Sequence, residues 1–198
     1  MIRIKTPEVP DTPAPSLWTI GPDGWCTNAR PVPSPNYNGR PDPADIALLV
    51  IHNISLPQGQ FANGNIENLF LNRLDCDCHA SFDSLRDLKV SSHFLIARDG
   101  QLIQFVSTLE RAWHAGISSF DGRSGCNDFS IGIELEGCDD LPFETVQYET
   151  LGALTQCLLA RFPIQHIAGH NEIAPGRKTD PGPFFDWQHF TQSLSGLA

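Results

Sequence analysis

Asp45-Ile46-Ala47-Leu48-Leu49-Val50-Ile51-His52-Asn53-Ile54 forms a continuous apolar run of strand length. A run without polar alternation is typical of a strand that is buried on both faces. His52 stands near the C-terminal end of the run. The stretch therefore predicts a central strand that carries an imidazole toward its C-terminal end.

Residues 129–137 alternate, as expected for a second strand. One face holds Phe129, Ile131, Ile133 and Leu135, and the other holds Ser130, Gly132, Glu134 and Glu136. This strand should present two carboxylates on one side.

The remaining pattern mixes helices and strands. Apolar residues recur at helical spacing in 65–74, in 145–162 up to Pro163, and in 184–194. Two apolar runs, 92–97 and 101–106, flank Arg98-Asp99-Gly100 and predict a hairpin, and 164–168 predicts a short strand. We expect a single α/β domain with a central mixed β-sheet packed by helices.

The N-terminal region is rich in proline. Ten of the 16 prolines lie within residues 1–43, where periodic apolar residues are scarce, so an irregular arm is expected there. We divide the chain into an N-terminal extension, residues 1–24, and a single folded domain, residues 25–198. A length of 198 residues with 40% hydrophobic residues is enough for one buried core.

Charge and hydropathy limit the partners. The net charge is -10, from 13 basic and 23 acidic residues, and no long basic run is present, so nucleic acid is not an expected partner. No apolar stretch reaches membrane-spanning length, and the N-terminus lacks the features of an export signal. We expect a cytoplasmic monomer with no membrane association.

The six cysteines are expected to be reduced thiols in that compartment, and Cys157 should be a small buried hydrophobe. Cys76-Asp77-Cys78-His79 contains zinc-binding residue types, but a second pair of ligands is missing. Incidental thiols in a loop are the favoured interpretation.

The segment from Gly169 to Pro183 reads GHNEIAPGRKTDPGP and brings several reactive groups together. Its prolines restrict the backbone, so polar side chains can be held in place. His170 and Asp180 could supply two ligands of a catalytic zinc ion, with Lys178 aimed at the same place.

Strand ends bring distant residues together, and His52, Glu134 and His170 all lie near predicted C-terminal strand ends. Such a set suits zinc-dependent hydrolysis, with Glu134 taking a proton from water and Lys178 stabilising an oxyanion. The pattern leaves alternatives open. His166, His93 or His114 could supply an imidazole, and Glu136 could supply the carboxylate. His52 could have a structural role, and Arg177 and Lys178 could be solvated charges.

Five stretches of the chain resemble the AmpD-type N-acetylmuramoyl-L-alanine amidases, whose fold is shared with peptidoglycan recognition proteins. They are residues 29–35 (ARPVPSP), 49–57 (LVIHNISLP), 111–116 (RAWHAG), 126–137 (CNDFSIGIELEG) and 177–183 (RKTDPGP). The resemblance extends from about Trp25 to Trp187. It covers nearly all of the chain outside the N-terminal extension.

The resemblance implies one Zn²⁺ per chain with His52, His170 and Asp180 as ligands, and Glu134 and Lys178 as the catalytic acidic and basic residues. It also implies hydrolysis of the amide between 1,6-anhydro-N-acetylmuramic acid and L-alanine during cytoplasmic cell-wall recycling. By consuming signalling muropeptides, such enzymes are linked indirectly to β-lactamase regulation.

The anhydro-muropeptide substrate requires local donors and cations in an acidic protein. Candidate contacts are Asn53, His93, Trp113, His114 and Arg123, with a core role equally open for Trp113 and a strand-anchoring role equally open for His93. Gly125 replaces a basic residue expected in relatives, a place that Arg123 could take over.

Two other functions are compatible with the sequence: an amidase acting on intact peptidoglycan, and a non-hydrolytic muropeptide-binding module. The lack of an export signal argues against the first. The complete set of ligand positions, together with Glu134 and Lys178, argues against the second.

Overall fold

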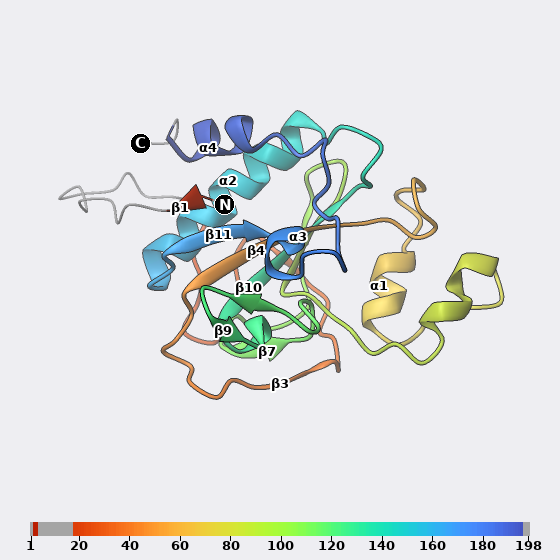
Figure 1. Cartoon of the computed structure of the whole chain (residues 1–198), viewed down its shortest axis with the longest axis horizontal. Helices are drawn as coiled ribbons and strands as arrows, with labels where there is room; N and C mark the ends of the chain where they lie inside the picture. Colours follow the sequence, from red (N-terminus) through yellow and green to blue (C-terminus); the bar gives the residue numbers. More distant parts are fainter. Residues whose placement is uncertain (1, 4–17, 196–198) are drawn as a thin grey trace.

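A computed structural model describes residues 2–3 and 18–195 and shows a mixed sheet with helices on both sides (Figure 1). The seven-stranded sheet has the order β1-β11-β4-β10-β5-β6-β2. Its strands are β1 (Ile2–Arg3), β2 (Arg30–Pro31), β4 (Leu48–Ile54), β5 (Phe94–Ile96), β6 (Leu102–Gln104), β10 (Ser130–Glu136) and β11 (His166–Gly169).

The two long strands predicted from the sequence lie side by side at the centre. β4 and β10 are parallel, and their register places His52 directly beside Glu134. β11 runs parallel to β4 on its other side, while β5 and β6 form the expected antiparallel hairpin. The C-terminal ends of β4, β10 and β11 therefore meet at one edge of the sheet, where a functional site is expected.

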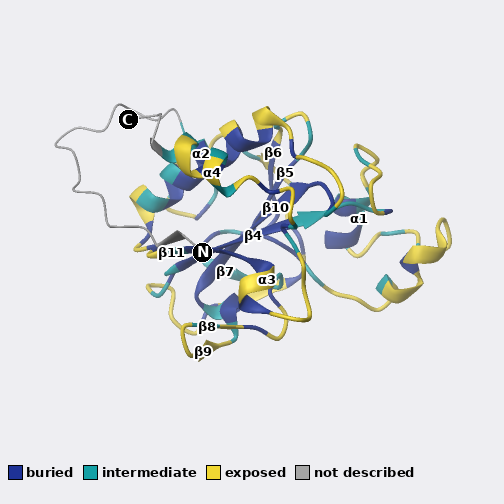
Figure 2. Cartoon of the chain, turned by 45° about the horizontal axis from the view of Figure 1, so that its top comes forward, coloured by how far each residue is buried: buried dark blue, intermediate teal, exposed yellow. Residues whose placement is uncertain are grey.

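Helices α2 (Thr145–Arg161) and α4 (Trp187–Ser195) cover one face of the sheet, as Figures 1 and 2 show. Leu49 and Ile51 of β4 and Ile131 and Ile133 of β10 belong to the core on this side. The first turn of α2 is closed by reciprocal hydrogen bonds between Glu144 and Gln147.

The opposite face carries smaller elements. They are α1 (Asn65–Phe70), the 3₁₀ helices η1 (Ala80–Leu85) and η2 (Cys126–Asp128), α3 (His170–Ile173), and strands β3 (Tyr37–Gly39), β7 (Glu110–Ala112), β8 (Ser119–Phe120) and β9 (Arg123–Ser124). Leu48 and Val50 pack there, so His52 points to this face. The predicted polar face of β10 shares it, although all seven β10 residues are buried.

The mixed α/β fold class and the order of elements are confirmed, with local differences. The helix predicted over 65–74 ends at Phe70, and the strand predicted over 164–168 begins and ends later, at His166 and Gly169. The segment expected to be a loop from residue 169 onward starts with the short helix α3.

The N-terminal arm is less irregular than the proline content predicted. β2 extends the sheet beside β6, and β3 pairs with β7. Partner strands can order a proline-rich segment that has little periodicity of its own. Trp18 and Ile20 pack against the main core, while residues 4–17 of the predicted extension lie outside the described residues. The boundary at residue 24 stays a prediction.

Two further features concern the cysteines and the helices. All six cysteines are free, and Cys157 is buried in α2. Across residues 18–195, no helix combines the length and the apolar character needed to cross a membrane.

Candidate metal centre and active site

Three side chains from separate elements converge at the C-terminal edge of the sheet. Gly169 at the end of β11 pairs with Ile51 of β4, so the residues that follow, His170 and His52, lie side by side. The Nδ1 atoms of these histidines are 2.9 Å apart, and each is 3.0 Å from Oδ2 of Asp180. Both imidazoles are almost fully buried, with exposed fractions of 1% and 2%.

The orientation of the rings fits a cation. Nε2 of His170 lies 3.1 Å from the carbonyl oxygen of Ala115, to which it donates, so a neutral ring keeps a lone pair on Nδ1. That lone pair faces the carboxylate of Asp180 and Nδ1 of His52. Three ligand atoms within 4.8 Å of one another therefore point at one place.

The donor set suits zinc. Imidazole nitrogen and carboxylate oxygen bind zinc at about 2.0–2.2 Å, and two histidines with one carboxylate leave a fourth position open, as catalytic sites require. Tetrahedral ligands at such distances are separated by about 3.3 Å, close to the observed spacing. The residues thus fit one zinc ion.

Protonation also favours metal binding. Burial is the main reason why the pKa of His52 falls to about 4; Asp180 opposes this, while the neighbouring His170 and Lys178 lower the pKa further. Burial alone would raise the pKa of Asp180, but the two adjoining imidazoles of His170 and His52 outweigh burial and hold this pKa below its usual range. Neutral imidazole and ionised carboxylate are the forms that bind a metal.

Glu134 is beside the cluster and has no partner of its own. Its Oε2 is buried and forms no hydrogen bond with the part of the chain that the structure describes. Burial raises the pKa of Glu134 well above its usual range, and the charge of Asp180 adds to this, while Lys178 opposes it. A buried carboxyl group beside a metal-binding cluster is suited to act in proton transfer.

Glu136, the rival carboxylate, has a different role. Its two oxygens accept the backbone N–H groups of Ala62, at 2.7 Å, and Arg98, at 3.1 Å. It therefore fixes two loops rather than facing the cluster. Of the two carboxylates on this strand face, Glu134 is the one left for chemistry.

A cleft of about 300 Å³ opens beside Asp180 of the cluster. Its lining includes Asn53 from β4, Asp139, and Arg177, Lys178 and Asp180 from the loop after α3. Lys178 is exposed at this cleft, as a group that meets substrate should be. Asn53 donates to Asp139, at 2.7 Å, and to the carbonyl oxygen of Pro181, at 3.0 Å, and so ties the two sides together.

The other predicted substrate contacts are spread around the site. His114 is partly exposed and contacts His52, whereas His93 is fully buried and accepts the Gly132 N–H, which supports its anchoring role. Trp113 is partly buried and donates from Nε1 to Asn38. Arg123 pairs with Asp45 and stacks over Phe129, and it does not line the cleft. Contact with substrate stays a prediction for all of them.

Several supporting residues have roles that no sequence pattern indicates. Arg177, one of the open alternatives for a solvated charge, donates to the carbonyl oxygens of Ala115 and Ile117, each at 2.7 Å. Asn127 accepts the N–H groups of His114 and Ala115. These bonds join segments that are distant in the chain, so spacing could not reveal them.

The cysteine motif does not form a second metal site. Among the described residues, Cys76, Cys78 and His79 do not converge as a ligand group. The ring of His79 instead accepts the N–H of Ser81 and caps η1. The interpretation as incidental loop thiols is the one that the geometry supports.

A mixed sheet with a His, His, Asp cluster, a buried carboxyl group and a cleft lysine is the architecture of a metal-dependent hydrolase. The model of the N-acetylmuramoyl-L-alanine amidase family matches residues 42–183, and the chain belongs to this family. The family resemblance noted in the sequence is thereby confirmed.

AmpD proteins are similar to this chain over most of its length. The chain is 52% identical over 170 residues to 1,6-anhydro-N-acetylmuramyl-L-alanine amidase AmpD of Citrobacter freundii, which covers 85% of this chain and 91% of that protein. It resembles a crystal structure of a selenomethionine AmpD derivative with a TM-score of 0.85 and 51% identity, over 87% of this chain and 97% of that one.

A more distant relative was solved with substrate. AmiD from Escherichia coli, in complex with anhydro-N-acetylmuramic acid-L-Ala-D-γ-Glu-L-Lys, has a TM-score of 0.57 and 31% identity. The match covers 88% of this chain and 65% of that one.

Proposed function

We propose that this chain is a zinc-dependent amidase that cleaves the bond between 1,6-anhydro-N-acetylmuramic acid and L-alanine in muropeptides, during cell-wall recycling in the cytoplasm. The observation that carries the proposal is the convergence of His52, His170 and Asp180 beside the unpartnered carboxyl group of Glu134. The name of the 52% identical AmpD relative, and the substrate bound in the more distant AmiD structure, support the substrate class.

The chain's own residues divide the work of hydrolysis. His52, His170 and Asp180 would hold zinc, which when bound polarises a carbonyl and lowers the pKa of water to about 7. Glu134, whose raised pKa makes it a better proton acceptor, takes the proton of the attacking water and then passes it to the departing amine. Lys178, at the cleft surface, stabilises the negative charge that develops on the carbonyl oxygen.

This arrangement supports hydrolysis over simple binding. A module that only bound muropeptide would gain nothing from a buried carboxyl group without a partner, which costs about 1–3 kcal/mol of stability. Hydrolysis uses that group. The unpartnered Glu134 is therefore best explained as part of the reaction.

The test is mass spectrometry of the products from an equimolar mixture of anhydro-muropeptide and the corresponding reducing muropeptide, with and without a chelator. The proposal predicts free peptide with N-terminal L-alanine and anhydro-N-acetylmuramic acid, and loss of both products with chelator. Equal cleavage of both substrates would refute the preference for the anhydro sugar. Binding without cleavage would indicate the non-hydrolytic module instead.

A further inference from the structure

One ligand is supported by another imidazole. Nε2 of His52, the ring nitrogen that faces away from the ligand cluster, lies 3.0 Å from Nδ1 of His114. The two rings meet edge to face, with centroids 5.1 Å apart. A ligand histidine usually donates its second N–H to a carboxylate, a carbonyl or water, so His114 occupies the position of an orienting partner.

The direction of the hydrogen bonds follows from Ser130. Its hydroxyl group lies 2.6 Å from the carbonyl oxygen of Cys126 and can only donate there. The Ser130 oxygen is therefore an acceptor for His114 Nε2, at 3.2 Å. A neutral His114 with its proton on Nε2 has a lone pair on Nδ1, and this lone pair accepts from His52 Nε2.

The consequence reaches the metal position. Once His52 carries its proton on Nε2, its Nδ1 has a free lone pair directed at His170 and Asp180. If His114 Nδ1 instead donated to His52 Nε2, the proton of His52 would lie on Nδ1, inside the cluster. Nε2 of His114 and the Ser130 oxygen would then be two acceptors facing each other. Only donation from His52 to His114 is compatible with a bound cation.

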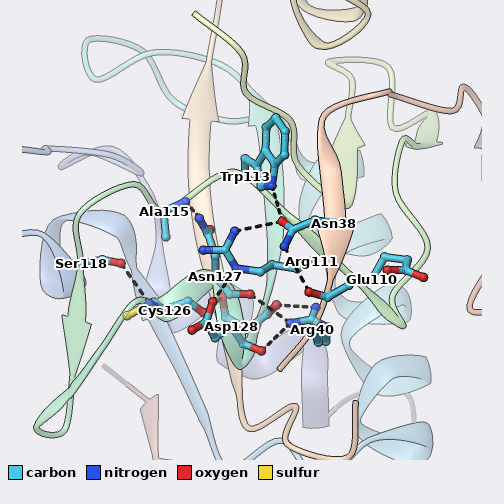
Figure 3. A network of polar contacts seen from close by, with 12 residues as sticks. Asn38, Arg40, Glu110, Arg111, Trp113, Ala115, Ser118, Cys126, Asn127 and Asp128 are labelled. Carbon is cyan, nitrogen blue, oxygen red and sulfur yellow. Dashed lines mark hydrogen bonds and ion pairs between the residues drawn. The ribbon is translucent and has the colours of Figure 1, made fainter. Parts of the chain in front are cut away.

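The fold provides a specific seat for the His114 ring. A Cβ atom at Gly132 would lie 2.5 Å from Cγ of His114, so the ring occupies space that only glycine leaves free. The backbone is held as well, because Oδ1 of Asn127 accepts the N–H groups of His114, at 3.1 Å, and Ala115, at 2.8 Å. Figure 3 shows Asn127 beneath this segment and the bond from Trp113 to Asn38.

We propose that His114 is a positioning residue for the metal centre, held by Ser130 in the tautomer that turns Nδ1 of His52 toward the metal. The proposal rests on the proposed zinc-dependent function. It assigns His114 an orienting role in place of, or in addition to, substrate contact.

Zinc affinity provides the first test. Equilibrium competition with a chromophoric zinc chelator should show that His114→Leu raises the zinc dissociation constant about 10- to 100-fold, the range typical for loss of an orienting partner. His114→Asn, whose Oδ1 can replace Nδ1 as an acceptor, should retain more affinity than His114→Leu. The control is His189→Leu, which removes a ring stacked on Tyr148 of α2, on the opposite face of the sheet from His52, and should leave zinc affinity unchanged. Unchanged affinity in a folded His114→Leu protein would overturn the proposal.

A double-mutant cycle separates positioning from a general structural role. Ser130→Ala should weaken zinc binding in the wild-type background but have no further effect in the His114→Leu background, because Ser130 acts through His114. Ser92→Ala is the matched control, since the Ser92 hydroxyl is buried and has no hydrogen-bond partner in the described part of the chain. Additive effects of Ser130→Ala and His114→Leu on zinc affinity would contradict the proposal that Ser130 acts through His114.

The tautomers can be read directly. Long-range ¹H–¹⁵N spectra of the zinc-loaded wild-type protein should show His52, His114 and His170 all protonated on Nε2. A proton on Nδ1 of His114 would overturn the proposal without any variant. If the wild-type protein binds no zinc or cleaves substrate without it, the proposed function fails; if it needs zinc but His114→Leu binds zinc normally, only the positioning role fails.

Discussion

Replacing Glu134 with glutamine separates the stability of the fold from its chemistry. The substitution keeps the volume of the side chain and removes its ability to accept a proton. Glu134 is buried, has an unpartnered oxygen and lies beside His52 in the register of β4 and β10. The expected result is a protein that folds and binds zinc but turns over poorly.

The size of the loss follows from the role of the carboxylate. A positioned general base contributes about 10²- to 10⁴-fold, and at 1.36 kcal/mol per factor of ten this corresponds to about 2.7–5.4 kcal/mol in the activation barrier. The stability of the Glu134→Gln protein, in contrast, should rise relative to the wild type. Burial raises the pKa of Glu134 in the folded state, so the ionised side chain disfavours folding as the pH rises above its unfolded value.

The stability of the metal-free Gln variant, relative to the metal-free wild type, should therefore increase with pH. Urea unfolding at several pH values measures this difference, while chromatographic product analysis gives kcat and elemental analysis gives the zinc content. Glu134→Gln with wild-type kcat would refute the role of Glu134 in proton transfer. A parallel Glu136→Gln protein, altered at a carboxylate that binds the N–H groups of Ala62 and Arg98, should instead lose stability.

Three further outcomes are expected. Gly132→Ala places a Cβ atom against the His114 ring, so it should weaken zinc binding in a chelator competition; wild-type affinity would show that the ring has room to move. Burial and the nearby Arg40 charge hold the pKa of His93 well below its usual range. The metal-free protein should therefore lose stability as the pH falls below about 6.5, where histidine in the unfolded chain takes up a proton. Urea unfolding should show a weaker pH dependence for His93→Gln. Lys178→Met should retain zinc, because Lys178 is exposed and is not a ligand, yet lose about 10²-fold or more in kcat; an equal kcat in steady-state assays would remove it from the mechanism.

The central strands were predictable because their patterns reflect burial directly. The apolar run before His52 and the alternation around Glu134 led to β4 and β10, with Glu134 and His52 on one face. Their parallel pairing follows from the topology of the sheet. The proline-rich arm was harder, because β2 and β3 are ordered by partner strands rather than by local periodicity.

The site was predictable in part for a similar reason. His52, His170 and Asp180 stand at strand ends and in a stiffened loop, and the structure brings them together. Pattern alone could not choose between Glu134 and Glu136, which share a face. The choice follows from their partners, since Glu136 binds two backbone N–H groups and Glu134 keeps a free oxygen.

The supporting residues lay beyond the sequence pattern. Ser130 reads as an ordinary polar residue of an alternating strand, and His114 was one of several histidines able to reach a cleft. Their hydrogen bonds connect β10, η2 and the segment after β7, which only the folded chain brings together. Side-chain to backbone bonds over long sequence separations leave no periodic signature.

The most direct test of the hydrolytic zinc centre is a zinc titration of protein that has been made metal-free with a chelator. Cleavage of anhydro-muropeptide, followed by mass spectrometry, should be absent without zinc, rise linearly and stop rising at one zinc per chain. His170→Ala should neither bind zinc tightly nor recover activity. Full cleavage by the metal-free protein, or by His170→Ala without zinc, would contradict the assignment of His52, His170 and Asp180 as a catalytic metal site.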